Sequence, residues 1–430
     1  MRIAIIGGSS FGTPNLLKVL ASKLSSERME VLLASRSPER LAAVERACHL
    51  LIREDLVVKT ESMGPGNWQK ILGGADSVVI QLRVGGFDGR LFDETFPNKY
   101  DLCGDEGLGA GGLSAGWRTW PVLAPILEAI ATFCPRAIVI LLTAPLSPLV
   151  RASLNYVDLN LVGICELPWT TLKDICASLG LQPCEVQADY LGVNHLGWFF
   201  NIRTGSRDLR YGLTGGRGCA TETYSSLNSQ SLRSQACLPT RYLRMHYETE
   251  RVLTEQRSQI VPRAKVLRDI QSRAYETYRN GTGSEIDSVL EQRPTPWYTQ
   301  AVGPLLLALD GQQVDIPFFL SGRNGTYVPF LGRDDIIESS HYWRDGRLQR
   351  APFSGDPPQH IVDNLVPFVQ FERAAVEAIT KRAIPLLREA LSVHPWVNNQ
   401  EGLETMVEEI VTTNDAMLMS EGGDYERCAL

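Results

Sequence analysis

Short apolar runs alternate with amphipathic stretches over the first third of the chain. Residues 2–8 form a β-branched apolar run typical of a buried parallel strand, and Thr13-Pro14 opens a helix directly after it. The same pattern predicts a strand at 29–34, an amphipathic helix at 38–51, and further buried strands at 76–82 and 137–143. This alternation of strands and helices is typical of a doubly wound α/β fold.

A glycine-rich turn, Gly7-Gly8-Ser9-Ser10-Phe11-Gly12, joins the first strand to its helix. A strand, a glycine turn and a helix in this order direct backbone N–H groups at a pyrophosphate. The spacing departs from GxGxxG, because Ser9 stands where the second glycine belongs. The turn alone therefore fits nucleotide binding and an ordinary structural turn equally well, and the later strands and helices favour nucleotide binding.

The second strand ends in Ala34-Ser35-Arg36-Ser37, where dinucleotide-binding folds usually carry Asp or Glu for the ribose hydroxyls. Without that acid, Ser35 and Arg36 suit a 2′-phosphate. Alternatively, Arg36 stacks on the adenine or faces solvent. We therefore expect NAD as the cofactor, with NADP as the competing interpretation.

Composition narrows the class of protein. With 430 residues, of which 44% are hydrophobic and 21% charged, the chain predicts two folded domains with buried cores. The net charge of −7 comes without a basic block, which argues against nucleic-acid and membrane-surface partners. The longest apolar stretch, residues 137–150, is interrupted by Pro145 and Pro148 and is too short to span a bilayer. We expect a cytoplasmic protein.

The cysteines and histidines limit the kinds of metal site. The nine cysteines are scattered and include no CxxC pair, which disfavours a zinc ribbon or a disulfide scaffold. Only six histidines occur, and none lies in an HExxH motif. Any metal site must therefore use few histidines.

More specific similarity lies in eight segments that follow one another along nearly the whole chain. They are GGSSFGTPNL (7–16), IQLRVGGFDGRLFDETFPNKYDLCGDEGLGAGG (80–112), GICELP (163–168), GVNHLGW (192–198), LPTRYLRMHYE (238–248), PRAKVL (262–267), NGTYVPFLGRDDIIE (324–338), and FERAAVEAI through SVHPWV (371–397). Together they resemble glycoside hydrolase family 4, the NAD- and metal-dependent 6-phospho-glycosidases.

The resemblance implies an architecture and a reaction. It predicts a Rossmann-like doubly wound NAD-binding domain over residues 1–165. A mixed α/β domain over 166–430 would supply substrate contacts and hold a homodimer or homotetramer together. Most glycosidases use two carboxylates, and this family is an exception. In its reaction, hydride leaves C3 of a sugar for NAD, a base takes the C2 proton, the group on C1 is expelled, water adds and the hydride returns. Mn2+ or another divalent ion polarises the C3 oxygen.

The resemblance also implies roles for individual residues. Cys165 and His195 match the metal ligands, and Tyr242 matches the base, whose pKa would need lowering by the metal and by Arg241 or Arg244. Taken singly, these three residues also fit a buried thiol, a core histidine and a packed helix tyrosine. The substrate-binding positions are Arg83, Glu106, Asn194 and, through phosphate, Arg263. The cofactor-binding positions are Gly7, Gly8, Ser9, Ser10, Phe11, Ser35, Arg36, Arg83 and Ala144.

Two departures from the family pattern lie at the expected substrate position. Ala144 replaces the asparagine of an Asn-Pro pair that hydrogen-bonds substrate hydroxyls, and Glu166 replaces the Asn or Asp that follows the metal cysteine. Glu166 could protonate the leaving group as a catalytic acid or join the metal. We infer a substrate other than the usual glucoside 6-phosphate.

Three classes of function remain open at this point. The first is a redox-neutral glycosidase acting on a sugar substrate, phosphorylated or not. The second is a lyase or dehydratase that applies the same early steps to a modified sugar or a nucleoside-like substrate, and a plain dehydrogenase is a lesser variant. The third is a non-catalytic NAD-binding sensor, which the retained Cys165, His195 and Tyr242 disfavour.

Overall fold

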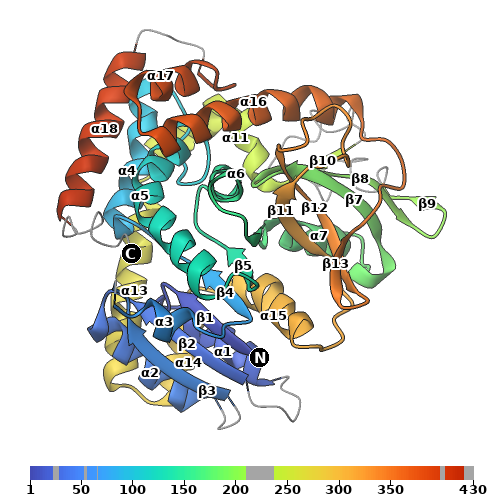
Figure 1. Ribbon diagram of the computed structural model, residues 1–430. Helices are drawn as coiled ribbons and strands as arrows, with labels where there is room; N and C mark the ends of the chain where they lie inside the picture. The colour runs from blue at the N-terminus through green and yellow to red at the C-terminus, as the bar shows by residue number, and fades with distance from the viewer. Residues whose placement is uncertain (23–28, 53–55, 65, 210–236, 398–401, 421–430) are drawn as a thin grey trace.

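The computed structural model describes residues 1–22, 29–52, 56–64, 66–209, 237–397 and 402–420. Within these ranges, 13 strands form one mixed sheet (Figure 1). Successive residues of the first strand enter different cores, because Ile3 and Ile5 pack into one apolar cluster and Ala4 and Ile6 into the other. Burial on both faces explains why this strand reads as a continuous apolar run.

Parallel strands make up one half of the sheet, in the order β6–β5–β4–β1–β2–β3. They are β1 (Arg2–Ile6), β2 (Met29–Ser35), β3 (Leu56–Ser62), β4 (Ser77–Ile80), β5 (Ile138–Leu141) and β6 (Asn160–Ile164). The chain order reverses between β1 and β4. Doubly wound folds bind ligands in the crevice at the carboxyl ends of such strands.

The helices of this half confirm the predicted alternation. They are α1 (Thr13–Ser22), α2 (Pro38–Leu51), α3 (Trp68–Leu72), α4 (Gly86–Thr95), α5 (Gly109–Phe133), α6 (Leu146–Tyr156) and α7 (Leu167–Ser178). The sequence did not predict β3, because this edge strand is apolar only at its start and carries Lys59 and Glu61 further along. The doubly wound fold class is confirmed.

The other half of the sheet is antiparallel (Figure 1). Its strands are β7 (Gln187–Val193), β8 (Leu196–Thr204), β9 (Arg207–Asp208), β10 (Cys237–Pro239), β11 (Phe318–Arg323), β12 (Ile336–Arg344) and β13 (Arg347–Arg350). Strand β11 pairs with β6, with Leu320 opposite Ile164, so the sheet continues across residue 165.

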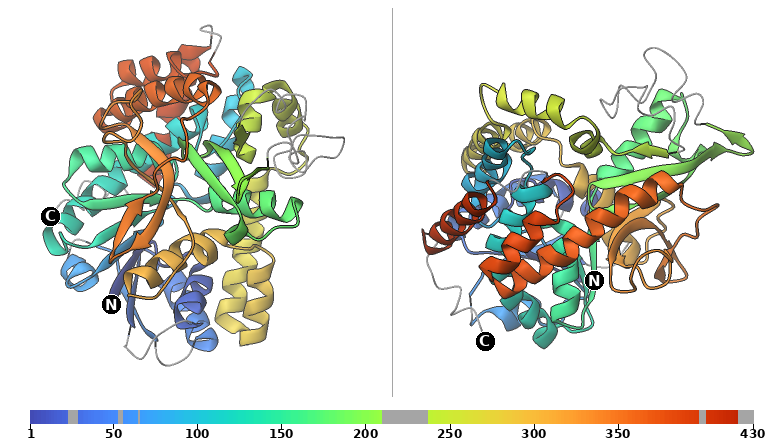
Figure 2. Two further views of the ribbon diagram at one scale, coloured as in Figure 1. Left: turned by 90° about the vertical axis from the view of Figure 1, so that its right-hand side faces the viewer. Right: turned by 90° about the horizontal axis from the view of Figure 1, so that it is seen from above.

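Helices from the later part of the chain cover both halves. They are α11 (Arg244–Tyr247), α12 (Thr249–Arg257), α13 (Arg263–Asn280), α14 (Gly283–Glu291), α15 (Gly303–Leu309), α16 (Gln359–Lys381), α17 (Ile384–Ser392) and α18 (Leu403–Ser420). Helices α13 and α14 pack on α2, and α15 packs on α1. Helices α16 and α18 pack on α5 (Figure 2). The domain boundary near residue 165 stays a prediction.

Among the described residues, no helix combines the length and the apolar character needed to cross a membrane.

Candidate active site

Many of the residues selected from the sequence lie at the carboxyl ends of neighbouring parallel strands. The turn at 7–12 follows β1, Ser35 ends β2, Arg83 follows β4, Ala144 follows β5 and Cys165 follows β6. Parallel strands end at one edge of a sheet, so these residues share that edge. Two further segments bring their own residues: the turn between β7 and β8 carries Asn194 and His195, and the helical turn after β10 carries Tyr242.

The glycines of the first turn allow close backbone packing. Gly7 has a φ of +84°, and a side-chain carbon on it would lie 2.7 Å from the carbonyl oxygen of Gln81. A side-chain carbon on Gly8 would lie 2.8 Å from the Cα of Leu33. Both glycine N–H groups donate to the Ala34 carbonyl, at 2.9 and 2.8 Å. The turn is therefore bound to the ends of β2 and β4, with no room for side chains.

Tyrosines from the later half of the chain hold the same turn from outside. Their hydroxyls donate as follows: Tyr275 to the Ser9 carbonyl at 2.6 Å, Tyr298 to the Ser10 hydroxyl at 3.3 Å, and Tyr278 to the Phe11 carbonyl. The nucleotide turn is thus completed by α13 and by residues 297–302, which the sequence pattern did not indicate.

The remaining predicted cofactor positions differ in exposure. The Ser9 and Ser35 hydroxyls lie 2.6 Å apart, which joins the ends of β1 and β2. Arg36 is exposed. Phe11 is buried, and the guanidinium of Arg293 lies 4.6 Å from its ring centroid. The Phe11 ring is therefore packed within the protein.

Cys165 and His195 lie together as the resemblance implied. The Cys165 sulfur is 3.6 Å from Nε2 of His195. Metal bonds to sulfur and imidazole nitrogen are about 2.0–2.3 Å long, so both atoms can ligate one ion. Nδ1 of His195 is buried without a hydrogen-bond partner in the described structure. A thiol sulfur and an imidazole nitrogen at this separation fit a divalent metal.

The surroundings of the pair affect its protonation. Burial lowers the pKa of His195 to about 4, which keeps the imidazole neutral and able to donate a lone pair. Burial, followed by the Glu166 charge, raises the pKa of the Cys165 thiol. The thiol donates to Oε2 of Glu166 at 3.5 Å. Among the described residues, however, no three His, Cys, Asp or Glu side chains gather as a metal site. That Glu166 joins the metal stays a prediction.

The ring of Tyr242 stacks on the imidazole of His195. The ring centroids are 4.5 Å apart and the planes differ by 3°. Burial, followed by the Asp105 charge, raises the pKa of Tyr242 well above its ordinary value, and Arg90 opposes this shift. The phenol therefore lies beside the proposed metal ligands, in a site that by itself keeps it protonated.

The expected help from Arg241 or Arg244 is not found. Arg241 lies 3.9 Å from the carboxylate of Asp174, and Arg244 is paired with Glu255. Arg90 is a cation that opposes the rise in the pKa of the phenol, whereas the Arg241 charge acts on His195 and Glu166.

The side chain of Asn194 is fixed by Glu338, a buried acid that sequence reasoning missed. Its amide donates to Oε1 of Glu338 at 3.2 Å, and the Tyr190 hydroxyl donates to Oε2 at 2.7 Å. The same amide also hydrogen-bonds to Cys165. Burial raises the pKa of Glu338 to about 7. In the sequence, Glu338 is marked only by its place at the end of the segment 324–338, directly after two isoleucines.

Arginines surround Glu106. Arg83 forms an ion pair with it, and Arg90 lies 2.9 Å from its Oε1 and 2.7 Å from Glu94. Burial raises the pKa of Glu106, but the charges of Arg83 and Arg90 outweigh burial and lower it to about 2. Burial, with the charges of Arg83 and Arg90, lowers the pKa of Arg293 to about 10. Three guanidinium groups thus lie in one cluster with three carboxyl groups, those of Glu94, Asp105 and Glu106. Sequence reasoning missed Arg90 and Arg293.

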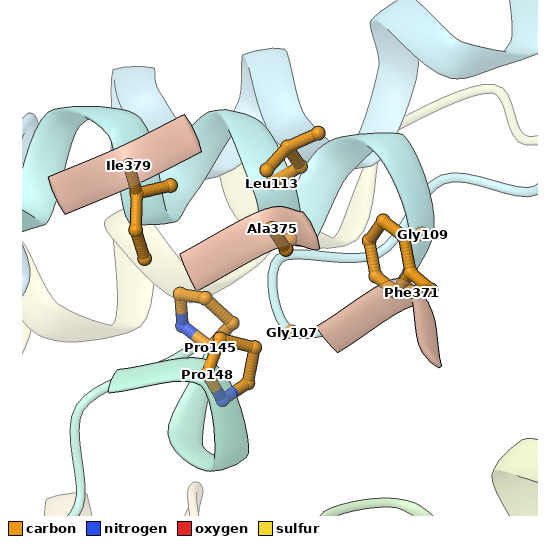
Figure 3. A pocket seen from close by; sticks show the side chains of 9 residues that line it. Gly107, Gly109, Leu113, Pro145, Pro148, Phe371, Ala375 and Ile379 are labelled. Atoms are coloured by element: carbon orange, nitrogen blue, oxygen red, sulfur yellow. The ribbon is translucent and has the colours of Figure 1, made fainter. Parts of the chain in front are cut away.

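Two other predicted positions lie at the margins of this site. Arg263 is exposed at the start of α13, which packs on α4. Pro145, which follows Ala144 in the chain, lines a cavity of about 10 Å³ with Gly107, Phe371 and Ile379 (Figure 3). That volume holds about one water molecule, and the lining is apolar. This cavity is therefore too small to be the sugar site.

Comparisons with known proteins agree with the geometry. The model of family 4 glycosyl hydrolases matches residues 2–181, and the model of their C-terminal domain matches residues 190–397. The chain is 27% identical to the 6-phospho-β-glucosidase BglT of Thermotoga maritima over 425 residues, which covers 96% of this chain and 98% of that protein.

Solved structures show the same fold over almost the full length. A structure of the 6-phospho-β-glucosidase from Thermotoga maritima with NAD and glucose-6-phosphate matches with a TM-score of 0.85 at 25% identity, covering 97% and 99% of the two chains. Another, with manganese, NAD+ and glucose-6-phosphate, matches with a TM-score of 0.84 at 24% identity and the same coverage. With both family models matched in order, the chain belongs to family 4 of the glycosyl hydrolases.

Proposed function

We propose that this protein is an NAD- and divalent-metal-dependent glycosidase that acts on a sugar phosphate glycoside through oxidation at C3, loss of the C2 proton, elimination at C1, hydration and reduction. The observation that carries this proposal is the contact among three segments: Cys165 and His195 lie 3.6 Å apart, and Tyr242 stacks on His195. A base beside two ligands of one metal ion suits removal of a proton next to a carbonyl.

When bound, NAD would accept and return the hydride, and the metal would polarise the oxygen on C3. Cys165 and His195 would hold the metal. The backbone of residues 7–12, with Ser35, Arg36, Arg83 and Ala144, would hold NAD at the carboxyl ends of the strands. The close packing of Gly7 and Gly8 supports this assignment because it holds the backbone at the start of the turn against the ends of β2 and β4.

The chain's own side chains would then handle protons and charge. Tyr242 would take the C2 proton, and Glu166, whose pKa burial raises, would protonate the leaving group. Asn194 would orient sugar hydroxyls. The guanidinium groups of Arg83, Arg90 and Arg293, gathered near Glu106, could donate to a phosphate on the substrate, in addition to those of the cofactor. Arg263 stays a predicted phosphate contact.

Hydrolysis is favoured over a lyase reaction because the relatives named above are glucosidases. The departures at Ala144 and Glu166 still lie where the substrate would bind. We therefore propose a sugar phosphate whose leaving group or hydroxyl pattern differs from that of a simple glucoside 6-phosphate.

NMR of candidate reactions in D2O tests the proposal. Wild-type protein with Mn2+ and catalytic NAD would be given 6-phospho-β-glucosides and their unphosphorylated counterparts. The expected result is deuterium at C2 of the released sugar, no accumulation of NADH, and a preference for the phosphorylated set. An unsaturated product would favour the lyase, and net NADH would indicate a plain dehydrogenase.

Metal dependence gives a second test. A chelator should abolish turnover and Mn2+ should restore it, while Cys165→Ser and His195→Ala should remove the response to metal without unfolding the chain. Full activity in a metal-free preparation would contradict the assignment.

The homodimeric or homotetrameric state and the cytoplasmic location stay predictions. Light scattering of the purified protein would measure the former.

A further inference from the structure

One threonine connects the segment of the proposed base to the segment of a proposed metal ligand. Thr240 lies between β10 and the helical turn Arg241–Leu243, and it is fully buried. Its hydroxyl donates to the backbone carbonyl of His195 at 2.7 Å. Its own N–H donates to the carbonyl of Gly197 at 2.8 Å. Thr240 therefore bonds to both sides of the turn that carries His195.

That turn has an unusual backbone. His195 has a φ of 133°, a conformation that residues with side chains rarely adopt, and it persists only where neighbouring contacts fix it. The His195 N–H donates to the Val193 carbonyl at 2.6 Å, and the His195 carbonyl is the acceptor of the Thr240 hydroxyl. Without that hydroxyl, one side of the strained peptide loses its partner.

The other end of the connection is Tyr242, two residues after Thr240. Its ring stacks on His195 at 4.5 Å, with the planes within 3°. The segment is also anchored upstream, where Pro239 pairs with Trp198, and downstream, where the Trp198 indole donates to Tyr247 at 2.9 Å. Those anchors hold the segment on the sheet, whereas Thr240 sets the position of Tyr242 relative to His195.

We propose that Thr240 is a positioning residue that keeps the Tyr242 phenol in register with His195, an inference that rests on the proposed function of these two residues. Proton transfer and metal binding at one sugar require both side chains to be placed within a fraction of an ångström. A buried hydroxyl that spans the two segments meets this requirement directly.

Paired substitutions separate the hydroxyl from the volume of the side chain. Thr240→Val keeps the shape and removes the hydrogen bond, whereas Thr240→Ser keeps the bond and removes a methyl group. Thr380→Val is the matched control, because its hydroxyl donates to the Val376 carbonyl within α16 at the same distance, 2.7 Å. We expect Thr240→Val to lower kcat by about 10²-fold with little change in KM, as a misplaced group does. Thr240→Ser and Thr380→Val should retain most of the activity.

Metal affinity supplies a readout that does not depend on turnover. The dissociation constant for Mn2+ would be measured without sugar or NAD from the electron paramagnetic resonance signal of free Mn2+. Loss of an outer support typically weakens metal binding by about 10–100-fold, so Thr240→Val should bind Mn2+ at least tenfold more weakly than Thr240→Ser. Should Thr240→Val fail to fold, Thr240→Ala and Thr240→Ser give the same comparison, since they differ only in the hydroxyl.

The outcomes distinguish the two proposals. If wild type exchanges C2 deuterium and Thr240→Val matches it in kcat and Mn2+ affinity, the role of Thr240 is overturned and the proposed function stands. Equal losses in Thr240→Val and Thr240→Ser would also overturn that role, because they would follow volume instead of the hydrogen bond. If wild type neither exchanges deuterium nor binds Mn2+, the proposed function fails and the role of Thr240 fails with it.

Discussion

The nucleotide half and the catalytic turns of this molecule are held in place by different kinds of contact. The turn at 7–12 is fixed first by regular parallel strands and by backbone hydrogen bonds from Gly7 and Gly8 to one carbonyl of β2, and tyrosine hydroxyls from α13 and residues 297–302 add to these. Cys165, His195 and Tyr242 lie in turns after β6, between β7 and β8, and after β10. Individual buried side chains join those turns.

The difference teaches where each region is vulnerable. In the nucleotide turn, a side-chain carbon added at Gly7 or Gly8 would meet backbone atoms, so substitutions that add volume there should be the most damaging. In the catalytic turns, the position of one residue depends on a polar atom far away in the sequence, such as Glu338 behind Asn194. There, changes that preserve volume but remove a polar atom should matter most.

Tyr242→Phe should have the largest effect of this kind. The substitution keeps the ring that stacks on His195 and removes the proton acceptor. Because a positioned general base contributes roughly 10²–10⁴-fold, C2 deuterium exchange should fall by about that factor. Hydride transfer at C3 is a separate step, so bound NAD should still be reduced. NMR in D2O and the absorbance of NADH would measure the two steps separately.

Tyr247→Phe is the matched control. Tyr247 lies in the same segment as Tyr242, but its hydroxyl hydrogen-bonds to Trp198 and His360. It should lower the free energy of unfolding and leave exchange largely intact. Exchange at the wild-type rate in Tyr242→Phe would assign the base to Glu166 or to a hydroxide instead.

A pair of glycines tests the nucleotide half. Gly7 and Gly311 have nearly equal φ values, +84° and +86°, but only at Gly7 would an added carbon meet another atom within 4 Å. Both substitutions to Ala should lose about 1–2 kcal/mol of stability through the backbone. Gly7→Ala should lose a further 1–3 kcal/mol or so from overpacking and should bind NAD more weakly. Denaturant unfolding and fluorescence titration with NAD would measure both effects, and equal behaviour of the two variants would refute the packing argument.

A pair of buried acids tests the catalytic turns. Glu338 accepts two donors, Tyr190 and Asn194, on separate oxygens, whereas Glu372 accepts from Ser147 at 2.7 Å. An amide has one acceptor oxygen, so Glu338→Gln leaves one donor unpaired, and Glu372→Gln can still satisfy Ser147. We expect Glu338→Gln to lose about 1–3 kcal/mol of unfolding free energy, more than Glu372→Gln, and to slow C2 exchange. The reverse order in urea unfolding would contradict this interpretation.

The same division explains what the sequence could and could not predict. Strands such as β1 and β4 are legible because burial on both faces demands apolar runs, and the turn at Gly7 follows from the strand before it. Cys165, His195 and Tyr242 were selected together because of the resemblance to glycoside hydrolase family 4. Thr240, Glu338 and Arg293 escaped notice because their partners lie 45, 144 and more than 200 residues away, and no local pattern marks such contacts. The pairing of Arg241 with Asp174 likewise joins residues far apart in the sequence.

The smallest expected effect concerns the pH dependence of the free energy of unfolding and His394, a buried histidine just after α17. Nδ1 of His394 accepts from the Trp396 N–H at 3.0 Å, and burial, followed by the His246 charge, lowers the pKa of His394 to about 3. In the unfolded chain a histidine titrates near 6.5, so the unfolded state binds more protons below that pH. The contribution of His394 to stability is therefore complete above pH 6.5 and is lost as the pH falls toward 3, by roughly 1 kcal/mol per pH unit.

His394→Asn places an acceptor near the same point but cannot titrate. Its unfolding free energy should therefore decline less steeply between pH 6.5 and 5.5, a window that follows from the same titration. If the unfolding free energies of His394→Asn and wild type changed with pH at the same slope, the buried neutral imidazole would not be a source of the pH dependence.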